Sequence, residues 1–163
     1  MSQKDAKSGL SHFDQEGRAR MVDVTDKAMA KRVAMAEGYI DMAPATAEII
    51  RTGTAKKGDV LGVARIAAVQ AAKRTDMLIP LCHQVPLSGF DVSWEFVTET
   101  RLRCQTTART QYVTGVEMEA LTAVGIGLLT VYDMCKAVDR GMTIGGIQLL
   151  HKEGGRSGIW DRA

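Results

Sequence analysis

Apolar and polar positions alternate along the middle of the chain and predict two neighbouring strands. In residues 90–96 every second side chain is apolar, which is the pattern of a strand with one buried face. The alternation returns in residues 102–108, after the turn region 98–100, so the two runs predict a hairpin. A last strand is predicted over residues 142–152.

Three other stretches favour helices. Pro44 suits the first turn of a short helix that Gly53 would end. A second helix opens at Gly58-Asp59 and repeats its apolar residues every three or four positions. The longest helix begins at Thr114-Gly115-Val116-Glu117, which has the spacing of a capping box, and runs to about Val138.

Residues 25–38 fit either a helix or a strand, and this choice decides the fold. With a strand there, the element order is β-α-β-β-α-β, the ferredoxin-like split βαβ. The prediction is then an α+β fold whose antiparallel sheet is covered by helices on one face. Residues 1–20 are polar and aperiodic, and we expect a flexible N-terminal arm before one domain over residues 21–163.

Composition excludes several classes of protein. The chain has 163 residues and a net charge of +2, which gives no electrostatic footprint for nucleic acid or for an anionic membrane. The longest uncharged run, residues 120–132, is shorter than the roughly 20 residues that span a bilayer, and it predicts a buried helix. The start lacks a secretory signal, and three cysteines without a CxxC pair fit a reducing cytoplasm.

Asp133 and Lys136 stand near the end of the long apolar helix, three residues apart and therefore on one face. An exposed helix ion pair is the simpler interpretation. The alternative is an acid and a base in a pocket, with proton affinities adjusted by partial burial. Spacing alone does not decide between them. The helix is apolar nearly all round, which indicates an oligomer interface.

Further polar residues are candidates for a site. His83 fits a proton donor, a ligand-binding group or a loop histidine bonded to backbone. Glu117 has a place in the capping box, so Glu119, beside an apolar run, is the better functional candidate. No metal site is predicted, because His12 and His151 lack ligand spacing. Basic residues that would suit a phosphorylated substrate, if they converge, are Lys56, Lys57, Lys73, Arg74, Lys152 and Arg156.

Several strings occur in one order along the chain. They include Met21-Val22-Asp23-Val24, Lys57-Gly58-Asp59-Val60, Ala71-Ala72-Lys73-Arg74-Thr75, Leu78-Ile79-Pro80-Leu81-Cys82-His83, Thr114-Gly115-Val116-Glu117-Met118-Glu119-Ala120-Leu121-Thr122, Tyr132-Asp133-Met134-Cys135-Lys136-Ala137-Val138 and the glycine-rich tail 154–158. Together they resemble the cyclic pyranopterin monophosphate synthase family of molybdenum cofactor biosynthesis, over residues 21–160.

That resemblance implies an enzyme of the lyase class. The family converts (8S)-3′,8-cyclo-7,8-dihydroguanosine 5′-triphosphate to cyclic pyranopterin monophosphate and releases pyrophosphate. Its members have the ferredoxin-like fold and assemble as hexamers, trimers of dimers, with active sites at subunit boundaries. No cofactor is implied by the sequence, and Mg²⁺ would arrive with the triphosphate. No nucleic-acid or membrane partner is expected.

The resemblance also assigns residues. It implies that Asp133, Lys136 and Lys57 are catalytic, with the lysines moving protons and Asp133 as their acid-base partner. Three departures from the family pattern, at Val113, Gln84 and Arg156, affect a peripheral phosphate contact and the shape of a loop. The implied substrate-binding residues are Leu81, Cys82, His83, Met118, Glu119, Arg32, Lys73 and Lys152.

Two other functions remain open at this point. A ferredoxin-like regulatory module could bind a nucleotide without catalysis, and it would keep its output after Lys136→Ala. An RNA-binding sheet would stack bases on exposed aromatic residues. Phe90, Trp94 and Phe96 share one face and are expected in the core instead.

Overall fold

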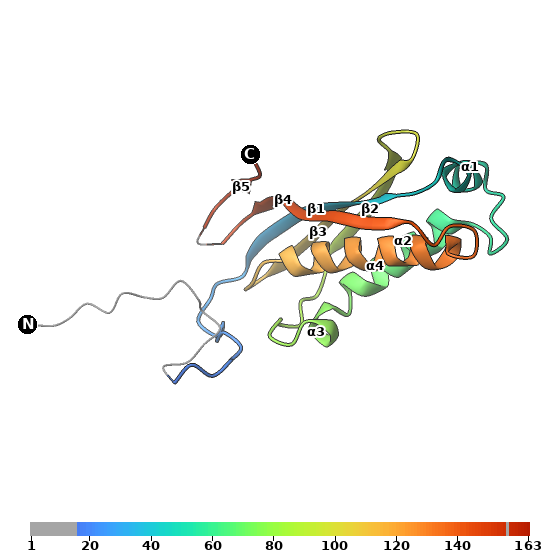
Figure 1. Ribbon diagram of the computed structural model, residues 1–163. Helices are drawn as coiled ribbons and strands as arrows, with labels where there is room; N and C mark the ends of the chain where they lie inside the picture. Colours follow the sequence, from blue (N-terminus) through green and yellow to red (C-terminus); the bar gives the residue numbers. More distant parts are fainter. Residues whose placement is uncertain (1–15, 156) are drawn as a thin grey trace, which may run out of the picture.

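Five strands form one antiparallel sheet in the order β2-β3-β1-β4-β5, and helices cover one of its faces (Figure 1). The computed structural model describes residues 16–155 and 157–163. The predicted arm is therefore largely outside the described residues, and the domain limits stay a prediction. The elements are β1 (Ala30–Asp41), α1 (Pro44–Thr52), α2 (Val60–Ala72), α3 (Thr75–Leu78), β2 (Gly89–Phe96), β3 (Arg101–Tyr112), α4 (Glu117–Cys135), β4 (Thr143–Glu153) and β5 (Trp160–Asp161).

The ambiguous segment 25–38 contributes the central strand. β1 pairs along its whole length with β3 on one side, and from Val33 to Asp41 with β4 on the other. Ala34, Ala36 and Ile40, at alternate positions, are fully buried towards the helices. The backbone hydrogen bonds of two neighbours outweigh the local helical propensity of this segment. The order of the first eight elements confirms the ferredoxin-like α+β prediction.

The core lies between the sheet and the two long helices, α2 and α4. Small residues let α4 approach the sheet closely: a Cβ atom at Gly38 would lie 2.7 Å from Val124 and 2.9 Å from Leu128. Trp94 of β2 packs near Gly127 of α4 on this covered face. Phe90 and Phe96 also pack against the core, as predicted, so these aromatic rings do not form an exposed platform for bases.

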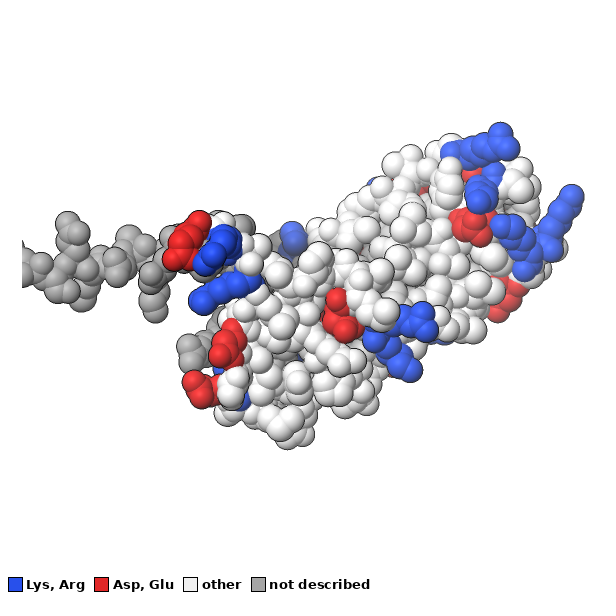
Figure 2. Space-filling model, turned by 90° about the horizontal axis from the view of Figure 1, so that it is seen from below, with Lys and Arg blue, Asp and Glu red and all other residues white. Residues whose placement is uncertain are grey.

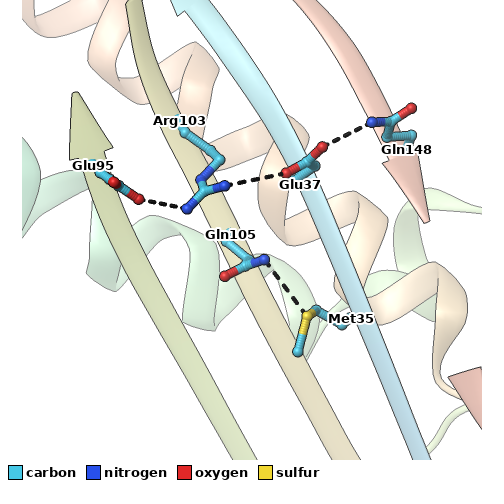
Figure 3. A network of polar contacts seen from close by, with 6 residues as sticks. All are labelled: Met35, Glu37, Glu95, Arg103, Gln105 and Gln148. Atoms are coloured by element: carbon cyan, nitrogen blue, oxygen red, sulfur yellow. Dashed lines mark hydrogen bonds and ion pairs between the residues drawn. The ribbon is translucent and has the colours of Figure 1, made fainter. Parts of the chain in front are cut away.

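The open face of the sheet is polar. Figure 3 shows a network that crosses from β2 to β4 through Glu37, which is only 6% exposed. Gln148 of β4 donates a hydrogen bond to the Glu37 carboxylate at 2.8 Å. Arg103 of β3 lies between that carboxylate and Glu95 of β2 and pairs with both. The network therefore links four adjacent strands side by side.

The helix boundaries agree with the predicted signals at α1 and α2. Gly53 ends α1 in the left-handed conformation, at φ 67°. Asp59 caps α2, because its side chain accepts a hydrogen bond from the Gly62 amide at 2.9 Å. The short helix α3 and the two-residue strand β5 were not predicted, since neither is long enough to show a period.

The predicted cap of α4 is wrong, and the helix ends three residues before the predicted limit. Val116 is the N-cap and makes no side-chain capping bond, so the capping box does not form. The helix ends at Cys135, with Lys136 as its C-cap, rather than at Val138. Asp139 explains the early end: its carboxylate accepts hydrogen bonds from the amides of Ala43 and Gly141, which draws the chain towards the start of α1.

By length and composition alone, α4 is apolar enough to cross a membrane. It packs instead on β1, β3, β4 and α2. Its buried residues include Val124, Leu128 and Val131, each with no exposed surface. We therefore describe α4 as the core helix of this fold, in agreement with the predicted buried helix.

Candidate active site

Three charged side chains meet at the C-terminal end of α4. Asp133 and Lys136 pair across one turn of helix, with 2.7 Å between Lys136 Nζ and Asp133 Oδ1. Lys57 arrives from the loop before α2, where Gly58 adopts φ 93° and turns the chain. Its ammonium donates to the Asp133 carbonyl oxygen at 2.8 Å and lies 3.3 Å from Oδ2. The structure thus brings together all three residues predicted as catalytic.

This cluster is open to solvent and carries mixed charge. The Asp133 side chain is 57% exposed and those of Lys57 and Lys136 about half. Figure 2, seen from the helix side, shows charged side chains gathered at the end of the molecule with α1, beside a broad uncharged surface. An apolar cavity of about 170 Å³ borders the cluster, with Lys57 and Cys135 in its wall.

The neighbouring charges set the protonation of the pair. The hydrogen bond from Lys136, and then that from Lys57, lowers the pKa of Asp133 below its usual range. The same bond to Asp133 raises the pKa of Lys136. At neutral pH Asp133 is therefore a carboxylate and Lys136 an ammonium. In this arrangement Asp133 can orient the two lysine side chains, and the lysines can donate a proton and stabilise negative charge.

A second group of predicted residues meets at the other end of α4. Leu81, Cys82 and His83, from the loop after α3, face Met118 and Glu119 of the first helical turn across a pocket of about 160 Å³. His83 Nε2 donates to the Val22 carbonyl oxygen at 2.7 Å, which leaves Nδ1 as the second polar atom of the ring. The three strings that contain Val22, His83 and Glu119 are therefore adjacent in space as well as ordered along the chain.

Glu119 is the buried acid of this pocket. It is 3% exposed, and burial raises its pKa to about 7. Its carboxyl group can therefore hold or release a proton near neutral pH. Cys82 beside it has a raised pKa, mainly through burial and then through the charge of Glu119, so its thiol is not activated as a nucleophile.

Arg32 and Lys152 line a larger cleft that adjoins this pocket. The cleft encloses about 610 Å³ and shares Thr114, Gly115 and Glu117 with the smaller pocket. Arg32 donates hydrogen bonds to the carbonyl oxygens of Tyr112 and Val113, which hold its guanidinium at the end of β3. Lys152, on β4, contacts the hydroxyl of Ser157.

The cleft also contains residues that the sequence analysis missed. Lys27 adds a third cation, and Asp26 and Glu117 add carboxylates. Lys27 lies in residues 25–38, for which the sequence fitted either a helix or a strand. The position of its side chain relative to Arg32 could therefore not be predicted. Glu117 had been assigned to the capping box. Because that box does not form, the assignment of Glu117 to a cap is wrong, and Glu117 lines the cleft instead.

Lys73 lies apart from the other predicted cations. It lines a separate groove of about 670 Å³ with Tyr112 and the loop 84–88, which includes Gln84. Arg156 and His12 lie outside the described residues. Among residues 16–155 and 157–163, no three His, Cys, Asp or Glu side chains are grouped to hold a metal ion.

The two groups stand at opposite ends of one helix. Glu119 and Asp133 are 14 positions apart in α4, and at 1.5 Å per residue this separates them by about 21 Å. Within a single chain, Lys57, Asp133 and Lys136 therefore do not converge with His83 and Glu119. The two groups are therefore separate within one chain.

A comparison with known protein families bears on these two groups. A model of the MoaC family matches residues 21–155. The match includes Asp133, Lys136 and Lys57 at one end of α4, and the pocket of His83 and Glu119 at the other. Most of the chain, and all of the sheet except β5, lies within the matched region. The chain therefore belongs to the MoaC family and has a role in molybdenum cofactor biosynthesis.

Proposed function

We propose that this protein converts (8S)-3′,8-cyclo-7,8-dihydroguanosine 5′-triphosphate to cyclic pyranopterin monophosphate and releases pyrophosphate. The observation that carries the proposal is the convergence of Lys57 and Lys136, from different elements, on Asp133. A reaction that rearranges a purine and closes a cyclic phosphate needs proton transfer and charge stabilisation. Two lysines on one carboxylate supply groups for both.

The second support is the cleft at the other end of α4. Lys27, Arg32 and Lys152 line it, and a triphosphate is a polyanion that such cations bind through charge-assisted hydrogen bonds. The adjoining pocket of Cys82, His83 and Glu119 would take the ring system. A divalent ion, where one takes part, would enter with the triphosphate.

A complete site then needs two chains. The halves lie about 21 Å apart on α4, farther than one nucleotide can connect through direct contacts at both ends. In a two-fold symmetric pair of antiparallel α4 helices, the C-terminal end of one helix would lie beside the N-terminal end of the other. Each dimer would then hold two complete sites, and three dimers would form the hexamer of the proposed assembly.

The roles of the charged groups follow from their protonation. Asp133 is ionised, so it would orient the two lysines rather than act as an acid. Lys136 would enter as an ammonium and act as the proton donor. Glu119, with a pKa of about 7, would move a proton at the other side of the substrate.

The test is turnover of the purified full-length protein with the cyclised dihydroguanosine triphosphate. We expect cyclic pyranopterin monophosphate and pyrophosphate in equal amounts. Lys136→Ala should abolish turnover but retain substrate binding by calorimetry. Arg140→Ala, which removes an exposed cation after α4, should keep both. Well-folded wild-type protein that binds the substrate and forms no product would favour a non-catalytic nucleotide-binding module instead.

A further inference from the structure

The chain folds back on itself after β4 and adds a short fifth strand to the sheet edge. His151 pairs with Asp161 and Lys152 with Trp160 in the backbone register. Arg162 continues the pairing, because its amide donates to the Leu150 carbonyl oxygen at 2.9 Å. β5 lies beyond the region matched by the family model, so the match says nothing about it.

A side-chain contact joins the two strands. His151 Nδ1 donates to Asp161 Oδ1 at 2.7 Å. The Arg162 guanidinium adds a hydrogen bond to the Leu149 carbonyl oxygen at 2.6 Å and lies over the Trp160 ring. A strand of two residues makes few backbone bonds, and these side-chain contacts add to its attachment.

The contact lies on the opposite side of the sheet from the cleft. His151 is opposite Met35 of β1, whose side chain belongs to the open face of the sheet (Figure 3). Lys152, one position on, is opposite Ala34, which is buried towards the helices. Successive side chains of a strand point to opposite faces, so Lys152 points towards the cleft while His151 and Asp161 do not.

The turn between β4 and β5 holds Lys152 in the cleft. The Lys152 ammonium contacts the Ser157 hydroxyl and lies 3.5 Å from the Gly154 carbonyl oxygen. Gly155 and Ser157 themselves line the cleft beside Lys152. Ser157 reaches this place because β5 returns along β4 and closes the turn that carries it.

We propose that the His151–Asp161 pair positions a cation of the substrate cleft. The pair holds β5 on β4, and β5 in turn keeps Ser157 beside Lys152. Lys152 is thereby fixed over the bound phosphates. The inference rests on the proposed function for the identity of the phosphates. His151 and Asp161 are positioning residues and do not touch the substrate. Their effect passes through Lys152.

The first experiment measures steady-state kinetics for His151→Ala, Asp161→Ala and Asp161→Asn in the full-length protein. We expect the two alanine variants to raise KM roughly threefold to tenfold with kcat nearly unchanged, as for the loss of a ground-state contact. Asp161→Asn keeps an accepting oxygen and should restore most of the affinity. Asp91→Ala is the matched control, because it breaks an exposed ion pair with Arg109 at the far edge of the sheet and should leave KM unchanged.

A second variant series tests whether the effect passes through Lys152. In a Lys152→Ala background, His151→Ala should raise KM no further, because coupled residues are not additive. Faster amide exchange at Arg162 would report the detached strand. The inference is wrong if the Arg162 amide exchanges faster while KM is unchanged. It is also wrong if the KM of the double variant rises by the product of the factors measured for Lys152→Ala and His151→Ala alone.

Binding of inorganic triphosphate, measured by calorimetry, separates the inference from the proposed function. If the wild type forms no product but binds triphosphate, and His151→Ala weakens that binding, the reaction is wrong and the positioning role stands. If the wild type forms product and the alanine variants of His151 and Asp161 keep the wild-type KM, the reaction stands and the positioning role is wrong. No triphosphate binding and no product would overturn both.

Discussion

The Lys57 ammonium donates a hydrogen bond to the backbone carbonyl oxygen of Asp133, 2.8 Å away, and approaches the same residue's carboxylate at 3.3 Å. The contact ties the loop before α2 to the end of α4, across 76 positions of sequence. An isolated helix with Asp133 and Lys136 one turn apart would form an ordinary surface pair. The second lysine distinguishes this cluster, because it is held there by the tertiary fold.

Replacement of Lys57 tests whether the cluster acts in catalysis. Lys57→Ala is expected to lower turnover by about 10²–10⁴-fold, the usual contribution of a positioned proton-transfer group. The thermal midpoint should change little, because the pair is exposed. Arg140→Ala removes an exposed charge that lies outside the cluster and is the control. Equal turnover in both variants would remove Lys57 from the mechanism.

Mixed oligomers test the two-chain site. Lys136→Ala and Glu119→Gln each damage a different half, so each variant alone should be nearly inactive. After unfolding and joint refolding, random pairing of the two variants should restore roughly a quarter of the wild-type activity, since half of the dimers are mixed and one site in each is intact. Turnover is measured before and after mixing. No recovery in verified mixed oligomers would show that both halves act within one chain.

The buried Glu119 predicts a particular dependence of stability on pH. Its pKa is about 7 in the folded protein against 4.5 when exposed, so the folded state binds more protons between these values. The free energy of unfolding should therefore fall as pH rises through this window, by up to about 3 kcal/mol, and then level off. Urea titrations from pH 4.5 to 8 measure it. Glu119→Gln should flatten the slope, and an unchanged slope would mean that another group causes it.

Asp139 predicts the opposite dependence in acid. Hydrogen bonds from the Ala43 amide, then from Thr46 and Gly141, lower the pKa of its carboxyl group. Its contribution is therefore present above the unfolded pKa of about 4 and is lost as pH falls through the lower folded value. Asp139→Ala should cost about 1–2 kcal/mol at pH 7, as for the loss of a helix-terminus carboxylate.

Urea unfolding of Asp139→Ala and Asp139→Asn would measure this cost. The asparagine variant keeps an acceptor for the Ala43 amide and should lose less. If both variants unfold as the wild type does, the contact to α1 contributes nothing measurable. Asp41→Ala, which removes an exposed pair with Arg101, serves as the control.

Local chemistry in the sequence was enough to predict much of the fold. Pro44, Gly53 and Asp59 act within one helical turn of themselves, so the limits of α1 and the start of α2 follow from nearby residues. The alternation of β2 and β3 reflects one buried face, a property of each strand alone. The family resemblance likewise depends only on the order of short strings, and the family model confirms it.

Other features depended on contacts between distant residues. β1 is a strand because β3 and β4 both pair with it, although its own propensities allow a helix. The spacing of Thr114 and Glu117 fits a capping box, yet the helix begins after Val116 and leaves Glu117 to the cleft. Lys73 belongs by sequence with the other basic residues but lines a separate groove.

The sequence by itself therefore determined the family, the order of elements and the residues that carry charge. The tertiary structure alone decided which of those residues meet: Lys57 with Asp133 at one end of α4, and His83 with Glu119 at the other. The physical reason is that periodicity and capping are local, whereas the distance between two side chains depends on every element packed between them. A rigid helix separates the two groups by about 21 Å, which no spacing in the sequence had shown.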